Sequence, residues 1–505
     1  MVHYHLLGFG ISHWAEKTPD KTAFIYSEQS ITYSQLEDKS CRLAAALQKM
    51  GIHRSDSILI YIPNCTLFPV IFYAAAKLQA NIVVANPQFK KTEIEQLIPA
   101  TRPKLAFVSY QSDKALVRDV DSSIKIVEIF YAGSVFHQML SEETPMKQIP
   151  QDHENPTVTI CTSGSTGRIK FVVRTFENQL IPAYHIIRNL RAGENDVAFV
   201  PLPLSQQYGL IAMIINFAFG GTMLVPSKFN AEQALVMIEK HKVTIQFGVP
   251  TMYIKEINAY EQMSKKPDIS SLRTGMISGA PAGVRCLEWF EENAGCRLLN
   301  SYGTTEIAAV TMTDLDDLQE IRYNTCGKAF EAVKLKIINE NGVALPAGET
   351  GQILCKTPYF MREYAGELEL THAAFDEEHW FLTEDIGSLD ENGNLSISGR
   401  KKDIIIRCGN NIFPSEIEVM LLTHQSVSEA CVIGNKDPVY GERTIALIKL
   451  KRGSHESEES LRAYAKTAIA KYKVPDRFIF IDEIPKLQNG KTNYLALKTI
   501  VASGK

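Results

Sequence analysis

Helical and strand-like patterns of apolar positions alternate along most of the chain. In one unit, Ala234, Leu235 and Ile238 share one face of a predicted helix. Asn230 stands ahead of this helix at N-cap spacing, three residues before a glutamine. The run VTIQF at residues 243–247 follows and is typical of a buried strand. Helices that lead into strands along a chain indicate an α/β architecture and not a helical bundle or a β-sandwich.

One long uncharged stretch has the length of a membrane span. Residues 197–227 contain no charged side chain, and residues 209–226 are apolar over most of their length. A Gly-Gly pair interrupts the stretch, so the pattern predicts a buried helix at residues 210–219 and a short strand at residues 222–225. We therefore expect a buried core segment here and no membrane span.

The character of the sequence changes at the turn Asn392-Gly393. A short alternating strand at residues 395–398 and the charged cluster at residues 400–403 follow this turn. We place a domain boundary there, with a large N-terminal domain of mixed α/β subdomains at residues 1–399 and a small α+β domain at residues 403–505. The elements expected in the small domain are helices at residues 414–423 and 457–470 and strands at residues 430–433 and 444–450.

Length and composition narrow the class of protein. The 505 residues predict about three structural units, or one large domain with a smaller appendage. The chain is 45% hydrophobic and 22% charged, which suits packed globular cores and excludes disordered and fibrous classes. Its 53 Lys and Arg residues against 57 Asp and Glu residues lack the basic excess of a nucleic-acid-binding protein, so any nucleotide it handles is expected to be small.

Cysteine usage and the N-terminus predict a cytoplasmic protein. The chain has nine cysteines, and the closest pair, Cys286 and Cys296, is too far apart for a CxxC metal or redox site. An odd number without paired spacing predicts reduced thiols. The first residues lack the basic region, long apolar run and cleavage site of a secretory signal.

One loop has the composition of a phosphate-binding site. The segment TSGSTGRIKF at residues 162–171 places two glycines and four hydroxyl side chains within six residues, directly after the strand-like VTIC. Glycine lets backbone amides approach an anion closely, and hydroxyl groups add donors. The spacing differs from that of the GxxxxGK[ST] nucleotide loop. On composition alone, a surface hairpin rich in Ser, Thr and Gly is the alternative.

Four further motifs follow this loop along the chain. They are NSYGTTE at residues 300–306, FLTEDIG at 381–387, SGRKKDIIIRCGNNIFPSEIE at 398–418 and LQNGKTNYLALK at 487–498. In this order the set resembles the acyl-adenylate-forming superfamily: acyl- and aryl-CoA ligases, adenylation domains of peptide synthetases and beetle luciferases. The resemblance spans essentially the whole chain. It implies an ATP-dependent enzyme that joins a carboxylic acid to AMP, releases pyrophosphate and passes the acyl group to a thiol.

The resemblance also implies an ATP and Mg²⁺ site. Glu306 would bind Mg²⁺, Asp385 and Arg400 would bind the ribose, and Lys491 would reach the carboxylate and α-phosphate oxygens. A carboxylate suits a hard cation, and cations neutralise charge at the reacting phosphate. The residues implied in catalysis are Lys491, Glu306 and Thr166. Those implied at the β- and γ-phosphates are Thr162, Ser163, Gly164, Ser165, Thr166, Gly167 and Lys170, and those implied to wall the adenine are Gly279, Ala280, Pro281, Ser301 and Tyr302, with Gly303 and Thr304 also in the nucleotide site.

A hinge and a thiol tunnel are implied as well. Lys402 falls in the hinge at residues 400–402, about which a mobile small domain would turn between the two steps. One orientation serves adenylation. The other places Cys408, Gly409 and Tyr440 beside the incoming thiol, which belongs to CoA or to the phosphopantetheine of a carrier protein.

Several residues depart from the family pattern. Arg168, Ile169 and Phe171 replace the lysine, proline and last glycine of the usual phosphate loop and make its exit bulkier. Glu384 stands beside Asp385 where glycine is common, and it adds negative charge near the nucleotide. Cys408 narrows a position that glycine usually holds. These departures motivate a remote alternative, a non-catalytic adenylate-binding protein.

The expected acid pocket contains Gln206, Gln207 and Tyr208, which can form hydrogen bonds or stack. No carboxylate occurs between Asp196 and Glu232 that could pair with a substrate ammonium group. The sequence therefore disfavours an α-amino acid and favours an aromatic or fatty carboxylic acid.

Two sets of features bear on the acceptor. One set resembles aryl-acid ligases that activate hydroxybenzoates for siderophores and load a carrier protein; it comprises the acid-pocket trio, GSTG at residues 164–167, VRT at residues 173–175 and Arg407. FGVPTMY at residues 247–253 and KYKVP at residues 471–475 are typical of acyl- and aryl-CoA ligases, and Tyr440 stands where such ligases often carry tryptophan. CoA is the preferred acceptor, and carrier-protein loading is the alternative.

Overall fold

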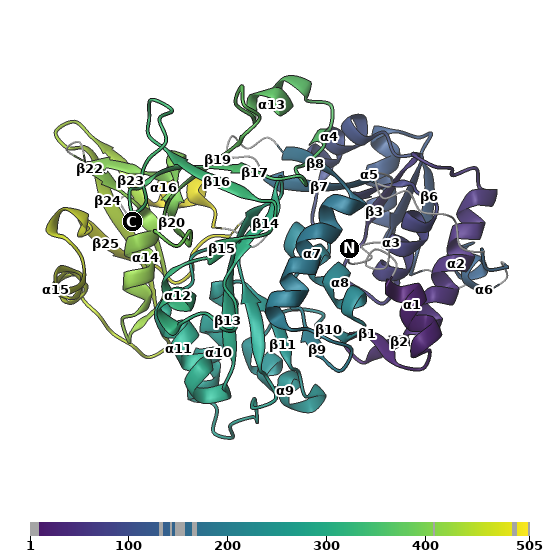
Figure 1. Cartoon of the computed structure of the whole chain (residues 1–505), viewed down its shortest axis with the longest axis horizontal. Helices are drawn as coiled ribbons and strands as arrows, with labels where there is room; N and C mark the ends of the chain where they lie inside the picture. Colours follow the sequence, from purple (N-terminus) through teal and green to yellow (C-terminus); the bar gives the residue numbers. More distant parts are fainter. Residues whose placement is uncertain are drawn as a thin grey trace.

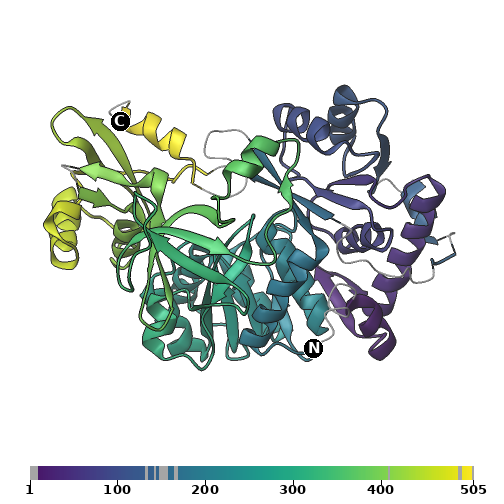
Figure 2. The same ribbon diagram turned by 45° about the horizontal axis from the view of Figure 1, so that its top comes forward.

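Four β-sheets and the helices around them make up the described part of the protein. The computed structural model describes residues 10–130, 135–141, 144–146, 157–163, 169–407, 410–486 and 492–502. Figure 1 shows the two largest sheets with helices between and around them, and Figures 1 and 2 both place the C-terminal sheet at the opposite end from the seven-stranded sheet. The predicted fold class, a large mixed α/β N-terminal domain with a small C-terminal domain, is confirmed.

The seven-stranded sheet has the order β18-β8-β7-β4-β3-β5-β6. Its strands from β7 to β6 run parallel, β8 returns antiparallel to β7, and β18 adds to the edge from much later in the chain. The strands are β3 (Ser57–Tyr61), β4 (Asn81–Val84), β5 (Leu105–Val108), β6 (Lys125–Glu128), β7 (Thr157–Ser163), β8 (Ile169–Thr175) and β18 (Glu363–Tyr364).

The nine-stranded sheet has the order β15-β14-β13-β12-β11-β9-β10-β1-β2. The strands from β13 to β1 run parallel, and antiparallel strands flank them on both sides. The strands are β1 (Thr22–Tyr26), β2 (Gln29–Thr32), β9 (Val197–Phe199), β10 (Thr222–Val225), β11 (Ile245–Gly248), β12 (Thr274–Ile277), β13 (Arg297–Thr304), β14 (Ala308–Met312) and β15 (Lys328–Ala329).

The largest apolar core joins these two sheets. It contains Ile58 and Val84 from one sheet, Met223 and Val225 from the other, and most of helices α3 and α8. Helices α4 and α5 cover the other face of the seven-stranded sheet, and α9, α10 and α11 cover that of the nine-stranded sheet. Both sheets are thus buried on two faces, as parallel sheets require.

The helices before residue 300 are α1 (Gly10–Lys17), α2 (Tyr33–Lys49), α3 (Leu67–Lys77), α4 (Lys91–Thr101), α5 (Gln111–Val120), α6 (Val135–Ser141), α7 (Phe176–Leu190), α8 (Gln207–Phe219), α9 (Ala231–His241), α10 (Pro250–Gln262) and α11 (Val284–Ala294).

Two smaller sheets follow in the sequence. A four-stranded antiparallel sheet has the order β16-β17-β19-β20, and a five-stranded sheet has the order β22-β21-β24-β23 with β25 also paired to β24. Helices α14 and α15 pack on one face of the five-stranded sheet and α16 on the other. The remaining elements are α12 (Gln319–Asn324), β16 (Lys334–Ile338), β17 (Gly351–Lys356), α13 (Leu368–Ala373), β19 (Phe381–Leu389), β20 (Leu395–Arg400), β21 (Ile405–Arg407), β22 (Asn410–Ile412), α14 (Pro414–Leu422), β23 (Val427–Asp437), β24 (Gly441–Leu450), α15 (Glu458–Ala468), β25 (Arg477–Phe480) and α16 (Tyr494–Ala502).

The elements predicted from apolar periodicity are largely confirmed. Asn230 caps α9 by accepting a hydrogen bond from the Gln233 amide, and α8 and β10 occupy the predicted uncharged stretch. Strand β11 begins at Ile245, two residues later than predicted, although the Thr244 amide already bonds to the Val197 carbonyl at 2.9 Å. In the small domain, β23 continues past the predicted strand to Asp437. The predicted limits of the two domains, at residues 399 and 403, stay predictions.

No helix in the described ranges is both long enough and apolar enough to cross a membrane.

Candidate active site

Strands β7 and β8 flank the predicted phosphate loop, and β7 ends at the carboxyl edge of a parallel sheet. Thr162 lies opposite Lys170, and Ser163 opposite Ile169. The carboxyl edges of open α/β sheets are where such folds bind ligands. The loop residues Gly164, Ser165, Thr166 and Gly167 lie outside the described residues. The hairpin therefore brings Thr162 and Lys170 together at the mouth of the predicted loop.

Glu306 and Lys170 both contact Tyr364. The Tyr364 hydroxyl donates a hydrogen bond of 2.9 Å to Oε1 of Glu306, and the Lys170 ammonium lies 4.8 Å from the centroid of the Tyr364 ring. Burial raises the pKa of the Tyr364 hydroxyl, and the Glu306 carboxylate acts in the same direction. The hydroxyl therefore stays a neutral donor across the physiological pH range.

Arg174 fixes the backbone that carries Glu306. Its guanidinium is fully buried on β8 and donates to the carbonyls of Thr305 and Glu306 at 3.1 and 2.8 Å. Two more bonds reach the carbonyls of Asn178 and Tyr359. Burial lowers the pKa of Arg174 to about 10, which leaves it charged at neutral pH. The cation thus ties the phosphate hairpin to the Glu306 loop through carbonyls.

A second polar cluster joins the nine-stranded sheet to the four-stranded sheet. Tyr302 on β13 donates 2.7 Å to Oδ2 of Asp385, and Arg400 Nε lies 3.1 Å from Oδ1. Asp385 and Arg400 are direct partners in the β19–β20 register. Burial raises the pKa of the Asp385 carboxyl, opposed mainly by Arg400, and the nearby carboxylates of Glu306 and Glu384 raise it further. Each carboxylate oxygen has two lone pairs, so Asp385 can still accept bonds from a ribose hydroxyl.

The predicted adenine wall lies where β12 and β13 end side by side. Gly279 has φ +89°, a left-handed conformation that suits glycine, and Ala280 and Pro281 are exposed after it. The neighbouring Ser278 hydroxyl donates to the Ser301 carbonyl at 2.8 Å, which joins this turn to the NSYGTTE motif. Within that motif, Gly303 leaves no room for a side chain, because a Cβ would lie 1.9 Å from the Ala308 carbonyl oxygen, and Thr304 accepts a hydrogen bond from the Glu306 amide.

The acid-pocket trio lies together at the start of α8, and the side chains of Gln207 and Tyr208 bond to other protein groups. Gln206 occupies the N-cap position. The Gln207 amide exchanges hydrogen bonds with the Gln179 amide at 2.9 and 3.2 Å. The Tyr208 hydroxyl donates 2.5 Å to the Met276 carbonyl, and burial raises its pKa. The polar atoms of Gln207 and Tyr208 are thus satisfied within the protein.

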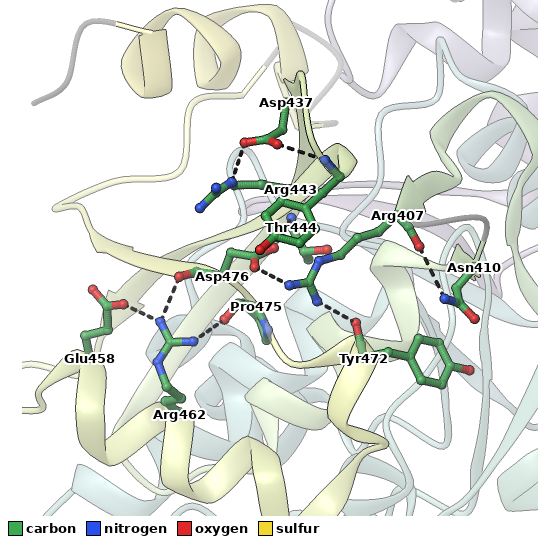
Figure 3. Close-up of polar contacts among 11 residues, drawn as sticks. Arg407, Asn410, Asp437, Arg443, Thr444, Glu458, Arg462, Tyr472, Pro475 and Asp476 are labelled. Carbon is green, nitrogen blue, oxygen red and sulfur yellow. Dashed lines mark hydrogen bonds and ion pairs between the residues drawn. The ribbon is translucent and has the colours of Figure 1, made fainter.

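The small domain supplies a separate cluster around Tyr440. The Tyr440 ring is 37% exposed, and the Arg407 and Arg443 guanidinium carbons lie 5.6 and 5.0 Å from its centroid. Figure 3 shows that Arg407 bonds to Asp476, which also bonds to the Thr444 amide. Lys402 is exposed in a short 3₁₀ turn at residues 401–403, and Cys408, Gly409 and Lys491 lie outside the described residues.

Two residues of this arrangement were not predicted. The segment VRT contains Arg174, but its role depends on carbonyls of distant segments. Tyr364 belongs to none of the five motifs, and it reaches Glu306 only because β18 pairs with β8. No signal in the sequence alone marks Tyr364.

Comparison with known proteins gives the family. Residues 11–365 match the AMP-binding enzyme family, and residues 416–491 match the AMP-binding enzyme C-terminal domain. The chain belongs to the AMP-binding enzyme family. Among curated relatives, this AMP-binding enzyme is 31% identical to 2-succinylbenzoate–CoA ligase of Bacillus pumilus, over 96% of each chain. It is 28% identical to medium-chain fatty-acid–CoA ligase of Escherichia coli, over 96% of this chain and 88% of the relative.

A solved structure supports the same family. The o-succinylbenzoate CoA synthetase of Bacillus subtilis, in complex with its acyl-adenylate intermediate, superposes with a TM-score of 0.83 at 27% identity over 97% of each chain. The family is that of AMP-forming acyl- and aryl-CoA ligases, and the relatives' acids range from aromatic to fatty. At this identity they leave the substrate of this AMP-binding enzyme open.

The described residues suit Mg²⁺ bound together with ATP. The described ranges contain no group of three or more His, Cys, Asp or Glu side chains that could hold a metal ion by protein ligands alone. Mg²⁺ usually takes one or two carboxylates plus substrate phosphates and waters. Glu306, whose Oε1 accepts a hydrogen bond from Tyr364, fits that donor set as the one carboxylate.

Proposed function

We propose that this enzyme adenylates a non-amino carboxylic acid, aromatic or fatty, with ATP and transfers the acyl group to a phosphopantetheine thiol, with CoA as the acceptor. The observation that carries this proposal is the buried Asp385 carboxylate, held by Tyr302 and Arg400 beside Glu306. The Asp385 carboxylate with Arg400 suits a ribose, and Glu306 suits a metal-bound triphosphate.

In the first step, a carboxylate oxygen of the acid attacks the α-phosphorus of ATP. The bond from that phosphorus to the bridging oxygen breaks, and pyrophosphate leaves. Both reactants are negative, so cations must lower the repulsion between them. Lys170 and Lys491 would hold phosphate and carboxylate oxygens, and Asp385 and Arg400 would hold the ribose. Mg²⁺ on Glu306 would neutralise phosphate charge.

In the second step, the thiol gives up its proton to the solvent, and its sulfur attacks the acyl carbonyl carbon. The bond from that carbon to the phosphate oxygen breaks, and AMP leaves with the electron pair. The small domain would turn about Lys402 between the steps, so that Cys408 and Gly409 line the thiol tunnel in place of Lys491 at the phosphates. One site would then run both reactions.

The uncharged surroundings of α8 favour an acid without an ammonium group. Gln207 and Tyr208 use their side-chain polar atoms in bonds to other protein groups, so neither would offer a charge to a substrate. The relatives include ligases for an aromatic acid and for medium-chain fatty acids, which supports the same range of acids. An acid pocket lined by uncharged side chains would bind its substrate mainly through apolar contact area.

Tyr440 favours CoA over a carrier protein. An exposed aromatic ring beside two arginines suits a nucleotide, because such a ring can stack on a base and the guanidinium donors left over from the Asp437 and Asp476 pairs could bind phosphates. A carrier-protein phosphopantetheine has no adenine to place there. We also propose a cytoplasmic location, which the eight free cysteines of the described ranges support.

The decisive experiment measures acid-dependent exchange of labelled pyrophosphate into ATP without any thiol. The panel contains aryl, hydroxyaryl, fatty and amino acids, and a strong signal from one class establishes adenylation and names the acid. CoA and a carrier protein are then compared as acceptors with that acid. Silence across the panel with intact ATP binding would contradict adenylation and favour a non-catalytic adenylate-binding protein.

The division of labour between the steps is tested with Lys491→Ala. This variant should lose about 10²- to 10³-fold in exchange, because one oriented cation is lost from the first step only. Thioester formation from supplied acyl-AMP should survive. Equal loss in both half-reactions would contradict the role given to Lys491.

A further inference from the structure

We propose that Tyr364 is a positioning residue that holds the Glu306 carboxylate for Mg²⁺ and keeps it apart from the Lys170 ammonium. This inference rests on the proposed function, in which Glu306 binds the metal. It concerns a tyrosine that lies outside every motif of the sequence.

The register of β8 and β18 gives Tyr364 its place. Tyr364 lies directly opposite Val172 in this antiparallel pair, and opposite residues project from the same face of a sheet. Lys170 and Arg174 lie two positions to either side of Val172, so they share that face and are diagonal neighbours of Tyr364. Side chains of this length reach across the diagonal, which explains the 4.8 Å approach of Lys170 Nζ to the ring centroid.

Tyr364 fixes one oxygen of Glu306 and leaves the other for a ligand. Its hydroxyl donates 2.9 Å to Oε1, and the Tyr364 side chain is only 3% exposed. No residue in the described ranges donates a hydrogen bond to Oε2 of Glu306. A phenol is a neutral donor, so it orients the carboxylate without cancelling the charge that a cation needs.

The ring also separates two opposite charges. Lys170 and Glu306 contact the same tyrosine from different sides, one at the ring face and one at the hydroxyl, and they form no ion pair with each other in the described structure. An ion pair between them would take the lysine from the phosphates and the carboxylate from the metal at once. The aromatic face still attracts the ammonium, so Lys170 keeps a defined position.

The backbone beneath Glu306 is held independently of Tyr364. Arg174 bonds to the Thr305 and Glu306 carbonyls, and the Met361 amide donates 2.6 Å to the Glu306 carbonyl. Loss of the tyrosine hydroxyl should therefore release the Glu306 side chain without moving its main chain. A substitution at Tyr364 can test side-chain positioning alone.

The experiment measures ATP binding by calorimetry, once with saturating Mg²⁺ and once in EDTA, on the full-length protein. The ratio of the two affinities is the Mg²⁺ enhancement. Tyr364→Phe keeps the ring and removes the hydroxyl, so we expect the enhancement to fall about tenfold, the usual effect of one hydrogen bond to a charged group. ATP affinity in EDTA should change less than about twofold, because Lys170 keeps its ring contact.

Tyr364→Leu removes the ring as well and should weaken ATP binding in EDTA in addition. The matched control is Tyr33→Phe, which removes a fully buried hydroxyl whose partner is the Gly221 carbonyl, and it should leave both affinities unchanged. Unchanged enhancement in Tyr364→Phe, or equal loss with and without Mg²⁺, would overturn the positioning role.

Glu306→Gln separates this inference from the proposed function. Lost enhancement in Glu306→Gln with normal enhancement in Tyr364→Phe would overturn only the positioning role. Normal enhancement in Glu306→Gln would overturn the metal role of Glu306 itself.

Discussion

The Tyr302 hydroxyl donates a hydrogen bond of 2.7 Å to the Asp385 carboxylate across 83 residues of sequence. The bond joins the end of a strand in the nine-stranded sheet to a strand of the four-stranded sheet. Arg400 approaches the other carboxylate oxygen from the next strand. A buried carboxylate with donors on both oxygens is a fixed acceptor, and fixed acceptors suit the recognition of a sugar.

Substitution of Asp385 by Asn should weaken ATP use. The amide keeps the shape but loses the charge that orients Arg400 and accepts from the ribose, so kcat/KM for ATP should fall about 10- to 100-fold. Steady-state pyrophosphate exchange against ATP concentration measures this effect.

Glu384→Gln is the matched control for Asp385→Asn. Glu384 is exposed, and solvent screens its charge, so removing it should lower the KM for ATP by less than about threefold. An unchanged kcat/KM in Asp385→Asn would contradict the ribose role.

Replacement of Arg174 by Met should destabilise the fold. Four carbonyls would lose a donor in the interior, so the free energy of unfolding should fall by about 3–5 kcal/mol. Urea denaturation followed by tryptophan fluorescence measures it. Arg118→Met, at an exposed position on α5, should change stability by less than about 0.5 kcal/mol. Equal stability of the two variants would show that the carbonyl contacts contribute little.

A buried carboxyl at Glu256 should make stability fall as pH rises. Glu256 is fully buried, accepts two bonds from the Gln246 amide, and burial raises its pKa from 4.5 to about 8. Between these values the unfolded chain releases a proton that the folded chain keeps, so each pH unit costs about 1.4 kcal/mol of stability. The contribution is fully present below pH 4.5 and is lost once the pH passes about 8.

Glu256→Gln removes this titration and should be more stable than the parent at pH 8 by at most about 5 kcal/mol. The difference should shrink steadily towards pH 5. Urea midpoints from pH 5 to pH 9 measure both proteins in one series. Parallel pH profiles for parent and variant would contradict the raised pKa.

Tyr440→Ala should impair the second step alone. Loss of a stacking ring should raise the KM for CoA by about tenfold or more, while pyrophosphate exchange stays unchanged. Tyr110→Ala, an exposed aromatic outside the proposed site, is the control and should leave both half-reactions unchanged. A normal KM for CoA in Tyr440→Ala would remove the reason to prefer CoA over a carrier protein.

The local pattern of apolar, capping and turn residues was enough to predict many of the helices and strands. Asn230 and the apolar face of α9 specify that helix within a dozen residues, and a glycine pair divides the uncharged stretch into α8 and β10. Such signals depend on neighbours in sequence, so no tertiary information is needed. The start of β11 differs from the prediction by two residues, which is the usual uncertainty of an element's end when it is read from local pattern.

The sequence by itself determined the motifs, their order and thus the family, since each motif is a short run whose chemistry is local. Through the family resemblance it also singled out Glu306, Asp385 and Arg400 as candidate nucleotide-site residues. Only the tertiary structure decided that Tyr302 meets Asp385, that Arg174 is buried among carbonyls, and that Tyr364 stands between Lys170 and Glu306. Those contacts depend on sheet register and on packing between strands far apart in the chain, which no single segment encodes.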